Sequence, residues 1–315
     1  MTSSAVGAGD TRDAAAKAAV LVEALPYILR FWNRVVVVKY GGNALAGSAE
    51  AGAHADALAS FAQDIVLMRS VGMLPVVVHG GGPQIGELLQ RLGKVTEFRD
   101  GQRVTDAETL EIARMVLVGK VNREIVSAIN IHGSLAVGLS GEDANLITAV
   151  PRRAELGFVG DVEVVAPDIL ERLLAQGLIP VVATIGTDDS GQAYNINADA
   201  VAGAVAAAVH AEKLVFLTDV PGLRAEPDDP ESVLRTVSLV DLESMIASGA
   251  AGGGMAPKAE ACVRAVKGGV RRAHVLDGRV PHALLLEIFT DEGVGTMVGD
   301  DLATEARAEG REVSP

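Results

Sequence analysis

The chain has 315 residues, enough for one large α/β unit or two domains. Lys and Arg number 27 against 41 Asp and Glu, the net charge is −14, and aromatic residues make up only 3%. Such a chain is a poor non-specific binder of nucleic acid or anionic membranes. The single cysteine, Cys262, fits a reducing compartment. No apolar run reaches the ~18 residues of a membrane-spanning helix, and the N-terminus lacks the features of a secretory signal. We therefore expect a cytoplasmic protein.

Residues 1–33 predict a disordered tip followed by a helix. Residues 1–12 are small and polar, whereas apolar residues recur at helical spacing between 13 and 33. Pro26 is expected to kink or break this helix. A helix placed before the first strand either packs on its own subunit or serves as an oligomerisation arm, and the residues alone leave both interpretations open.

From residue 34 onward, short apolar runs alternate with helical stretches. Strands are predicted at 34–39, 74–79, 135–139, 178–184, 213–218 and 273–276. Helices are predicted at 53–70, 85–92, 106–132, 199–210 and 255–267. The Val-rich strands lack alternation, which is typical of parallel strands buried on both faces. The fold class is therefore α/β with helices on both faces of the sheet, and residues 300–315 are expected to form a flexible acidic tail.

Two glycine-rich loops follow apolar strands. The first reads Lys39-Tyr40-Gly41-Gly42, where a lysine ends the strand and glycines let backbone N–H groups approach an anion. The second reads His79-Gly-Gly-Gly-Pro83, where a helix N-terminus supplies further N–H donors. Lys39 could instead extend to solvent from the strand end, and His79 could be a packed core histidine.

Three further polar positions come before or within helix starts. Arg103 precedes a helix that Thr105 or Asp106 could cap, and its guanidinium could clamp a carboxylate. Asp199 follows two asparagines at the start of an Ala-rich helix, and Lys258 follows a run of three glycines. Read singly, these residues could be an exposed arginine, an ordinary first-turn acid and a solvated helix lysine.

Several common enzyme signatures are missing from the sequence. Neither the dinucleotide fingerprint G-x-G-x-x-G nor the P-loop G-x-x-x-x-G-K-[ST] occurs. There is no G-x-S-x-G elbow, no H-E-x-x-H pattern and no cluster with metal-ligand spacing. These absences disfavour a nucleotide-dependent dehydrogenase, a P-loop enzyme, an α/β-hydrolase and a protein-held metal.

Two lysines, two anion-binding loops and one acid suit phosphoryl transfer, in which catalysis is mostly positioning and charge neutralisation. A carboxylate acceptor would need no general base, because it is already ionised near neutral pH. The remaining obstacle is repulsion between two anions, about 4 kcal/mol at 4 Å and an effective dielectric of 20. Fixed lysines and a phosphate-bound Mg²⁺ would offset that repulsion.

The motifs containing Lys39, His79, Arg103, Asn195 to Asp199 and Lys258 resemble, in order and spacing, those of the acetylglutamate kinases of the amino acid kinase superfamily. The resemblance implies a three-layer α/β/α sandwich with a mainly parallel sheet and an N-terminal helix extension. It implies an acceptor lobe over about 34–210 and an ATP lobe over about 211–299. It further implies ATP-dependent phosphorylation of the γ-carboxylate of N-acetyl-L-glutamate in arginine biosynthesis, with Mg²⁺ held by the phosphates.

Residue by residue, the resemblance makes Lys39 and Lys258 stabilisers of the transferred phosphoryl group, with Asp199 holding both. The implied acceptor-binding residues are Gly81, Gly82, Arg103 and Asn195. The implied phosphate- or nucleotide-binding residues are Gly42, Gly80, Thr218, Asp219, Gly222 and Leu223. The sequence departs from many relatives at Glu142 and Ala144, where they have Lys and Gly, which puts contacts between the lobes in question.

The C-terminal region resembles that of arginine-inhibited acetylglutamate kinases. The resemblance implies an L-arginine site in which Glu287 pairs with the ligand, His274 and the 293–295 loop (Gly293 and Gly295) line the pocket, and Tyr27 closes it. Glu287 could otherwise be a local cap or ion-pair partner. The resemblance also implies a homodimer, or a hexamer assembled through the N-terminal helix.

Other functions remain open at this point. Glutamate 5-kinase and uridylate kinase share the superfamily's sheet and lysines, although the triple-glycine loop with Arg103 favours the acetylated acceptor. A non-catalytic arginine or nucleotide sensor with this fold would not need to retain Lys39, Asp199 and Lys258 together.

Overall fold

The structure, a computed structural model, describes residues 8–41, 53–226, 229, 231–251, 255–290 and 293–300. Its centre is an eight-stranded sheet in the order β12-β14-β13-β11-β1-β2-β8-β5. The strands are β1 Val35–Tyr40, β2 Leu74–His79, β5 Ala136–Ser140, β8 Ile179–Ala183, β11 Lys213–Thr218, β12 Thr236–Ser238, β13 Arg272–Asp277 and β14 Gly295–Gly299. The predicted α/β class is confirmed.

The central sheet is mainly parallel, as expected. Parallel pairing runs from β13 through β11, β1, β2 and β8 to β5. Only β14 runs against its neighbour β13, and β12 pairs parallel with β14. Residues 34–210 therefore supply the four strands of one half of this sheet, and the chain from 211 onward supplies the other four.

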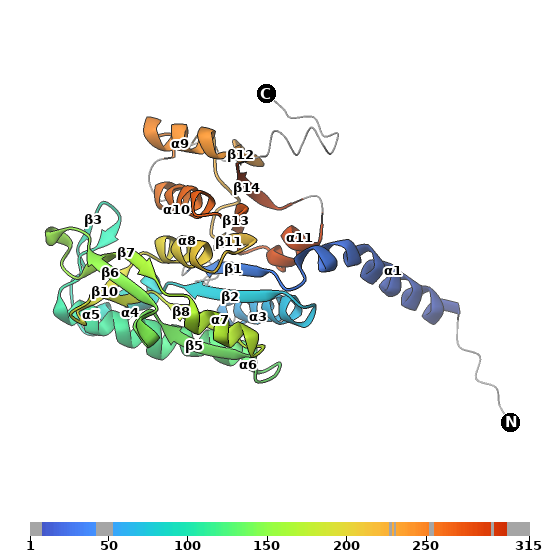
Figure 1. Cartoon of the computed structure of the whole chain (residues 1–315), viewed down its shortest axis with the longest axis horizontal. Coiled ribbons are helices and arrows are strands. Elements are labelled where there is room, and N and C mark those ends of the chain that lie inside the picture. The colour runs from blue at the N-terminus through green and yellow to red at the C-terminus, as the bar shows by residue number, and fades with distance from the viewer. Residues whose placement is uncertain are drawn as a thin grey trace.

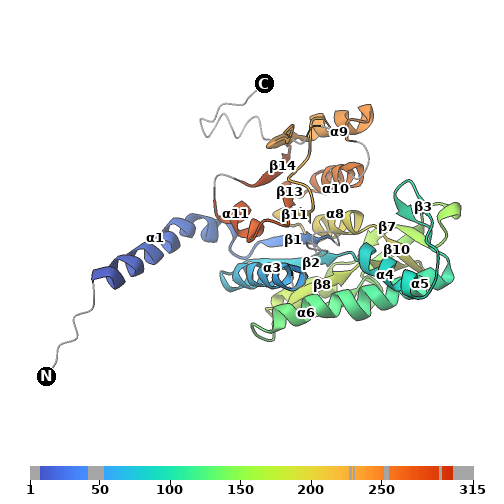
Figure 2. The same cartoon turned by 180° about the vertical axis from the view of Figure 1, so that it is seen from behind.

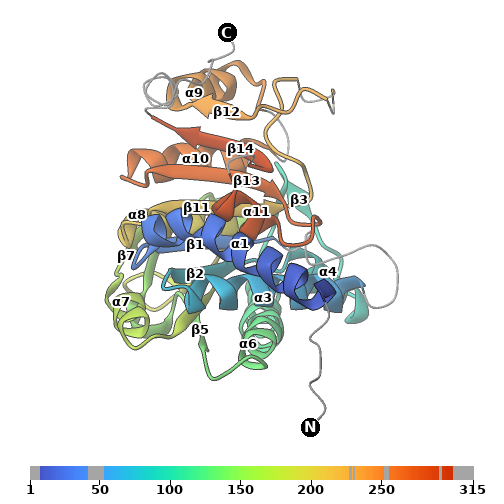
Figure 3. The same cartoon turned by 90° about the vertical axis from the view of Figure 1, so that its right-hand side faces the viewer.

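Helices cover both faces of the sheet, which makes three layers (Figure 3). Val36, Val38 and Tyr40 of β1 belong to one buried cluster, together with residues of α3 Ala53–Ser70, α6 Asn122–Asn130 and α11 Ala283–Phe289. Val37 belongs to the opposite cluster, which is completed by α7 Asp168–Ala175, α8 Ala198–Ala208, α9 Leu239–Ser248 and α10 Ala256–Lys267. Burial on both faces explains why these strands show no alternation.

The stretch predicted as one helix over 106–132 contains a π-helical segment. It consists of α5 Ala107–Arg114, the π segment η1 Met115–Val121 and α6 (Figure 2). Asp106 caps α5 by accepting a hydrogen bond from the Thr109 N–H, so of the two expected caps the aspartate is used. A π segment inserts a residue into the helical repeat and often marks a functional region.

A second, small sheet lies at the end of the molecule reached by the carboxyl ends of β1 and β2 (Figure 1). It closes in the order β10-β7-β6-β9, from β6 Ile147–Pro151, β7 Val159–Val165, β9 Ile185–Thr187 and β10 Ala193–Ile196. The helix α4 Gly82–Arg91 and the hairpin β3 Phe98–Arg99 with β4 Gln102–Arg103 lie at the same end (Figure 1). This sheet was not predicted from the sequence.

Helix α1, Ala8–Phe31, extends away from the body (Figure 1). It begins five residues before the predicted start, so residues 8–12 are helical rather than disordered, while 1–7 lie outside the described residues. Pro26 does not break the helix. Large apolar side chains along it are exposed, namely Val20, Leu21, Val22, Leu25 and Leu29, as is Trp32 in the turn after it. The predicted tail, apart from Asp300, also lies outside the described residues.

Candidate active site

Lys39, Asp199 and Lys258, which are far apart in the sequence, form one cluster. The Lys39 Nζ lies 2.7 Å from the Asp199 Oδ1, and the Lys258 Nζ lies 3.6 Å from the Oδ2. The side chains of Lys39 and Asp199 are 10% and 7% exposed, and that of Lys258 is 18% exposed. One buried carboxylate therefore holds two cations, leaving a net positive charge at the cluster.

Local sequence explains how three distant residues meet. Lys39 is the fifth residue of β1 and faces α8, and a Cβ on Gly41 would lie 3.2 Å from its Nζ, so the lysine lies over a glycine. Helices α8 and α10 pack closely because α8 is rich in Ala and has a glycine, Gly203, at the contact. A Cβ at Gly203 would lie 3.0 Å from the backbone oxygen of Ala261. This close approach brings Lys258, in the first turn of α10, to Asp199 in the first turn of α8.

The electrostatics of the cluster keep the acid ionised. Burial on its own would raise the pKa of Asp199, but the charges of Lys39 and Lys258 outweigh burial and hold the pKa below its usual value. Asp199 also lies at the positive end of α8, which Asn197 caps by accepting from the N–H groups of Asp199 and Ala200. The cluster can thus present two fixed ammonium groups to an anion.

The triple-glycine loop lies against the same helix start. A Cβ on Gly80 would lie 3.3 Å from that of Ala198, and one on Gly81 would lie 2.8 Å from a Leu117 methyl. A Cβ on Gly82 would have no atom within 4 Å. Pro83 is the second residue of α4, and Gly81 is the N-cap. Free space over Gly82, at a helix N-terminus, can accommodate an anion. Gly42, in the other loop, lies outside the described residues.

Arg103 lies beside the glycine loop. Its guanidinium donates to the Gly82 carbonyl at 2.9 Å and to the Thr96 hydroxyl at 3.1 Å, and it lies 4.8 Å from the centroid of the Phe98 ring. Asn195 lies in β10, four residues before Asp199. The structure therefore brings Arg103 to Gly82 at the start of α4, and Gly80 to Ala198, which precedes Asp199.

The candidate nucleotide residues follow β11, next to β1. Thr218 ends the strand and its hydroxyl donates to the Asp219 carboxylate at 3.1 Å. Gly222 packs tightly on Thr296, because a Cβ there would lie 2.5 Å from the Thr296 hydroxyl. Leu223 is buried, and its N–H donates to that same hydroxyl at 2.8 Å. The Leu223 N–H and side chain are therefore engaged within the protein.

Two residues of the candidate arginine site, His274 and Gly293, lie against Glu287 on α11. The His274 Nδ1 lies 2.7 Å from the Glu287 Oε1, and the Glu287 Oε2 accepts from the Val294 N–H at 3.1 Å. A Cβ on Gly293 would lie 3.4 Å from that Oε2. Gly295 begins β14 instead of completing a loop. Tyr27 is half-buried on α1, which packs on α11.

Sequence reasoning missed Lys213, which belongs to this second cluster. Lys213 is 7% exposed, and its Nζ lies 5.1 Å from the centroid of the Phe31 ring at the end of α1. Burial lowers the pKa of Lys213 to about 8, opposed by the charge of Glu287. Burial, aided by the charge of Lys213, lowers the pKa of His274 to about 4. The sequence feature that could have identified Lys213 is a charged residue at the first position of an apolar strand, all of which is buried in the structure.

The two departures from the family pattern lie close together after β5. Glu142 pairs with Arg114 at 2.7 Å, so its partner is α5 rather than a distant lobe. Ala144 has φ +54°, a left-handed conformation that glycine adopts without strain. Glycine would therefore suit this backbone better than alanine does.

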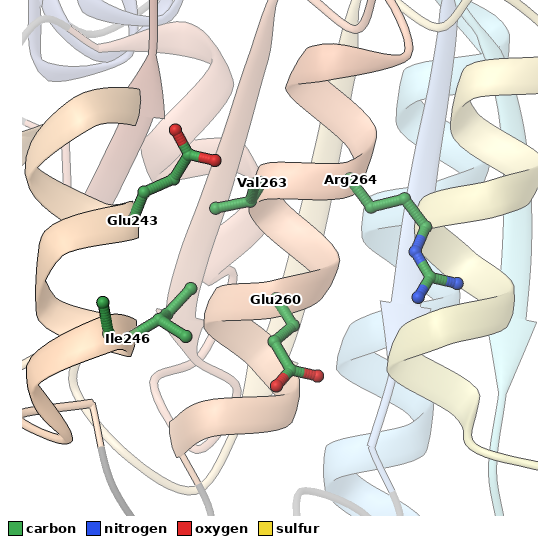
Figure 4. Close-up of a pocket in the computed structure, with 6 residues that line it drawn as sticks. Glu243, Ile246, Glu260, Val263 and Arg264 are labelled. Atoms are coloured by element: carbon green, nitrogen blue, oxygen red, sulfur yellow. The ribbon is translucent and has the colours of Figure 1, made fainter.

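An open pocket of about 350 Å³ lies between α9 and α10 (Figure 4). Its lining residues are Glu243, Ile246, Ala247, Glu260, Val263 and Arg264. None of them is a predicted site residue, and Glu243 on α9 and Val263 on α10 lie across it from one another (Figure 4). We assign the site to the lysine cluster because its charged side chains meet at one aspartate. The side chains that line this pocket do not converge in this way.

A parallel α/β sandwich that fixes two lysines on one aspartate, beside a glycine-rich helix start, has the features of a phosphotransferase. The family model described as "Amino acid kinase family" matches residues 34–277, and the chain belongs to the amino acid kinase family. In the described residues, no helix is long and apolar enough to cross a membrane.

Curated relatives match over almost their whole length. The acetylglutamate kinase of Symbiobacterium thermophilum is 56% identical over 291 residues, covering 90% of this chain and 97% of that protein. The acetylglutamate kinase of a Synechococcus species is 52% identical over 288 residues, covering 91% and 96%.

Solved structures of related fold include N-acetylglutamate synthase from Neisseria gonorrhoeae. Its complex with coenzyme A and N-acetyl-glutamate gives a TM-score of 0.75 at 27% identity, covering 92% of this chain and 68% of that one. Its complex with coenzyme A and L-arginine gives 0.74 at 27% identity, covering 90% and 65%. Carbamate kinase from Giardia lamblia, bound to AMP-PNP, shares the fold with a TM-score of 0.64 at 16% identity, covering 85% and 99%.

Proposed function

We propose that this chain is an acetylglutamate kinase, which transfers the γ-phosphoryl group of ATP to the γ-carboxylate of N-acetyl-L-glutamate. The observation that carries the proposal is the contact of Lys39 and Lys258 with one buried Asp199. Relatives of that name, at 56% and 52% identity, support the choice of acceptor. As an ATP-dependent enzyme of amino acid biosynthesis, it is expected to work in the cytoplasm.

The geometry suits transfer between two anions. The acceptor carboxylate is already ionised, so no side chain has to remove a proton. The two ammonium groups, held by Asp199, lower the repulsion of about 4 kcal/mol expected between unit charges at 4 Å. They are fixed before substrate arrives, so little reorganisation is needed during the reaction. These two cations stabilise the negative charge that spreads over the oxygens of the transferred phosphoryl group.

The acceptor belongs on the side of α4. There the N–H groups of residues 80–82 and the α4 N-terminus receive the reacting carboxylate, and Gly82 leaves room for it. Arg103 and Asn195 fix the α-carboxylate. ATP lies toward β11, near Thr218 and Asp219, on the half of the sheet built from residues after 210.

Mg²⁺ would reach this site with the nucleotide. Both oxygens of Asp199, the acid of the cluster, are within ion-pair distance of lysines. The described residues include no group of three or more His, Cys, Asp or Glu side chains arranged to hold a metal. The phosphates would therefore hold the ion, which neutralises phosphate charge when bound.

An acceptor panel tests the proposal. ATP consumption by the purified protein is measured in parallel with N-acetylglutamate, glutamate, aspartate and UMP. We expect turnover with N-acetylglutamate at least about 100-fold above the others, since an acetyl group buried in a fitted pocket can supply a few kcal/mol. Faster turnover of glutamate or UMP would assign the chain to another branch of the family.

We also propose that L-arginine inhibits the enzyme through the cluster of His274, Glu287 and Gly293. The Glu287 carboxylate suits a guanidinium, and α1 packs on α11, so a ligand there can bias how α1 and the lobes are arranged. The N-acetylglutamate synthase structure with coenzyme A and L-arginine, a relative at 27% identity, supports arginine as a ligand of this fold.

We further propose that copies of the chain assemble through α1. The exposed apolar side chains of this helix need a partner surface, and a second copy of the chain supplies one in a hexamer built from dimers. Light scattering after deletion of residues 1–30 tests this. We expect a change from hexamer to dimer with activity retained, and an unchanged mass would restrict α1 to its own subunit.

A further inference from the structure

His79 precedes the triple-glycine loop, and its ring is fully buried, 0% exposed. Its Nδ1 lies 3.0 Å from the Gly80 carbonyl oxygen, and its Nε2 lies 3.1 Å from the Asn122 Nδ2. Both ring nitrogens are thus engaged within the protein. His79 is not in a position to touch substrate, and the proposed mechanism makes no use of it.

The partners of Asn122 determine which ring nitrogen carries the proton. The Asn122 amide nitrogen also donates to the Val181 carbonyl at 2.8 Å, and Arg123 donates to the Asn122 Oδ1. The amide is therefore oriented with its NH₂ group toward His79, whose Nε2 accepts. The proton then resides on Nδ1, which donates to the Gly80 carbonyl. Burial, aided by the charge of Arg123, lowers the pKa of His79 to about 4, so the ring is neutral.

The π segment and a glycine on β5 make room for the contact between Asn122 and His79. Asn122 follows directly on the π segment η1, whose Leu117 and Val121 pack over Gly81. On β5, Gly138 leaves the space that Asn122 and Arg123 fill, since a Cβ there would overlap both side chains. Without the extra residue of the π segment, the residues after it would be rotated around the helix axis.

The contact with Gly80 matters because the peptide it holds lies between two glycines. The Gly80–Gly81 peptide is trans, so its C=O and N–H point in opposite directions. With no Cβ on either side, the peptide could rotate at small cost. Rotation would turn a carbonyl oxygen, instead of an N–H, toward a bound carboxylate.

We propose that Arg123, Asn122 and His79 form a positioning relay, which holds the Gly80 carbonyl inward so that the Gly81 N–H faces the acceptor carboxylate. This inference rests on the proposed role of the glycine loop as the carboxylate site. His79 is a positioning residue, because it acts through the Gly80–Gly81 peptide and does not touch the reacting atoms.

Two conservative substitutions separate the two contacts of the ring. In His79→Asn, the amide nitrogen occupies roughly the place of Nδ1 and keeps the donation to Gly80. In His79→Gln, the amide reaches the place of Nε2, which keeps a contact with Asn122 and loses the one with Gly80. Each variant loses one buried hydrogen bond, so similar losses of thermal stability are expected. His132→Gln, at the exposed end of α6, is the control.

Steady-state kinetics and melting temperatures are measured for all four proteins. We expect His79→Gln to lower kcat/KM for N-acetylglutamate about 10- to 100-fold, as for one lost hydrogen bond to a charged ligand, with KM for ATP within about twofold. His79→Asn should remain within about threefold of wild type. Its pH profile should match that of wild type between about pH 6 and 9, because the ring does not titrate there.

Equal effects of the two variants on kcat/KM, in an active wild-type enzyme, would overturn the relay and reduce His79 to a packing role. A changed pH profile in His79→Asn would overturn it in favour of a titrating histidine. A folded wild-type protein that does not phosphorylate N-acetylglutamate would overturn the proposed function, and the relay with it.

Discussion

Two buried lysines on neighbouring strands have opposite surroundings. Lys39 lies near the carboxyl end of β1, on the face covered by α8 and α10, and Lys213 begins β11 at its amino end, on the face that carries Val215. As whole residues, Lys39 and Lys213 are 8% and 7% exposed. Lys39 shares one aspartate with Lys258, whereas Lys213 is balanced by Glu287 beside a neutral His274.

This contrast shows that burial alone does not define an active site. At the carboxyl edge two cations share one anion, and the cluster retains a positive charge that a phosphoryl group can use. At the amino end of β11, Lys213 is influenced by the opposite charge of Glu287 and by the like charges of Arg272 and Arg30. Ligands of parallel α/β sheets bind at the carboxyl edge, which suits chemistry at Lys39 and leaves the other edge for regulation.

The largest effect is expected at the carboxyl edge. Lys258→Ala should lower kcat by ~10²–10³-fold, because a fixed charge facing the transferred group is lost. Lys267→Ala, which removes a surface lysine of the same helix paired with Glu243, is the control and should keep kcat within about twofold. Near-wild-type turnover in Lys258→Ala would remove this lysine from the mechanism.

A change at the amino edge should affect regulation. Glu287→Gln keeps the size of the side chain but removes its charge, so the arginine concentration for half inhibition should rise at least about tenfold. The uninhibited rate should change by less than about twofold. Inhibition curves with the surface control Glu243→Gln establish the baseline, and a curve unchanged in Glu287→Gln would refute the assigned site.

Two buried histidines make stability depend on pH. His79 and His274 have folded pKa values of about 4, below their unfolded value of 6.5, so only the unfolded chain takes up protons between these values. The free energy of unfolding should therefore fall as pH drops from about 6.5 to 4, by about 1–3 kcal/mol per histidine.

Urea unfolding at several pH values measures this dependence. His79→Gln removes one of the two titrating groups and should flatten the curve by roughly half. A wild-type protein as stable at pH 4.5 as at pH 7 would show that the rings are not held neutral.

The smallest effect concerns the backbone near the carboxyl edge. Ala144→Gly should raise the free energy of unfolding by about 0.5–1 kcal/mol, because glycine adopts the left-handed conformation at φ +54° without strain. Ala175→Gly, at an exposed end of α7, should lower it by a similar amount. Destabilisation by Ala144→Gly would mean that the alanine side chain contributes packing there.

Much of the fold was predictable from the sequence. The apolar runs at β2 and β11 and the helix α3 were predicted with the bounds that the structure has, because continuous burial leaves a clear hydrophobic pattern. The small sheet was missed because β7, with sequence VGDVEVV, carries acids and is only partly buried. The π segment was missed because its apolar residues continue a helical pattern.

The candidate site was predictable only where residues at loops stand out. Lys39 was identified because glycines follow it, whereas the only sign of Lys213 is a charge at the start of an apolar strand. The side-chain partner of His79, Asn122, lies on α6, so the sequence near His79 carries no sign of it. Long-range packing, such as that of α8 on α10 through Gly203, determines which charges meet.

The most direct test replaces the two buried lysines one at a time with methionine, which is unbranched and nearly as long but carries no charge. The measurement is kcat at saturating ATP and N-acetylglutamate, with melting temperature as a check on folding. We predict that Lys39→Met lowers kcat by ~10²–10³-fold while Lys213→Met stays within about threefold. Equal losses in two folded variants, or a larger loss in Lys213→Met, would contradict the assignment of chemistry to the carboxyl edge.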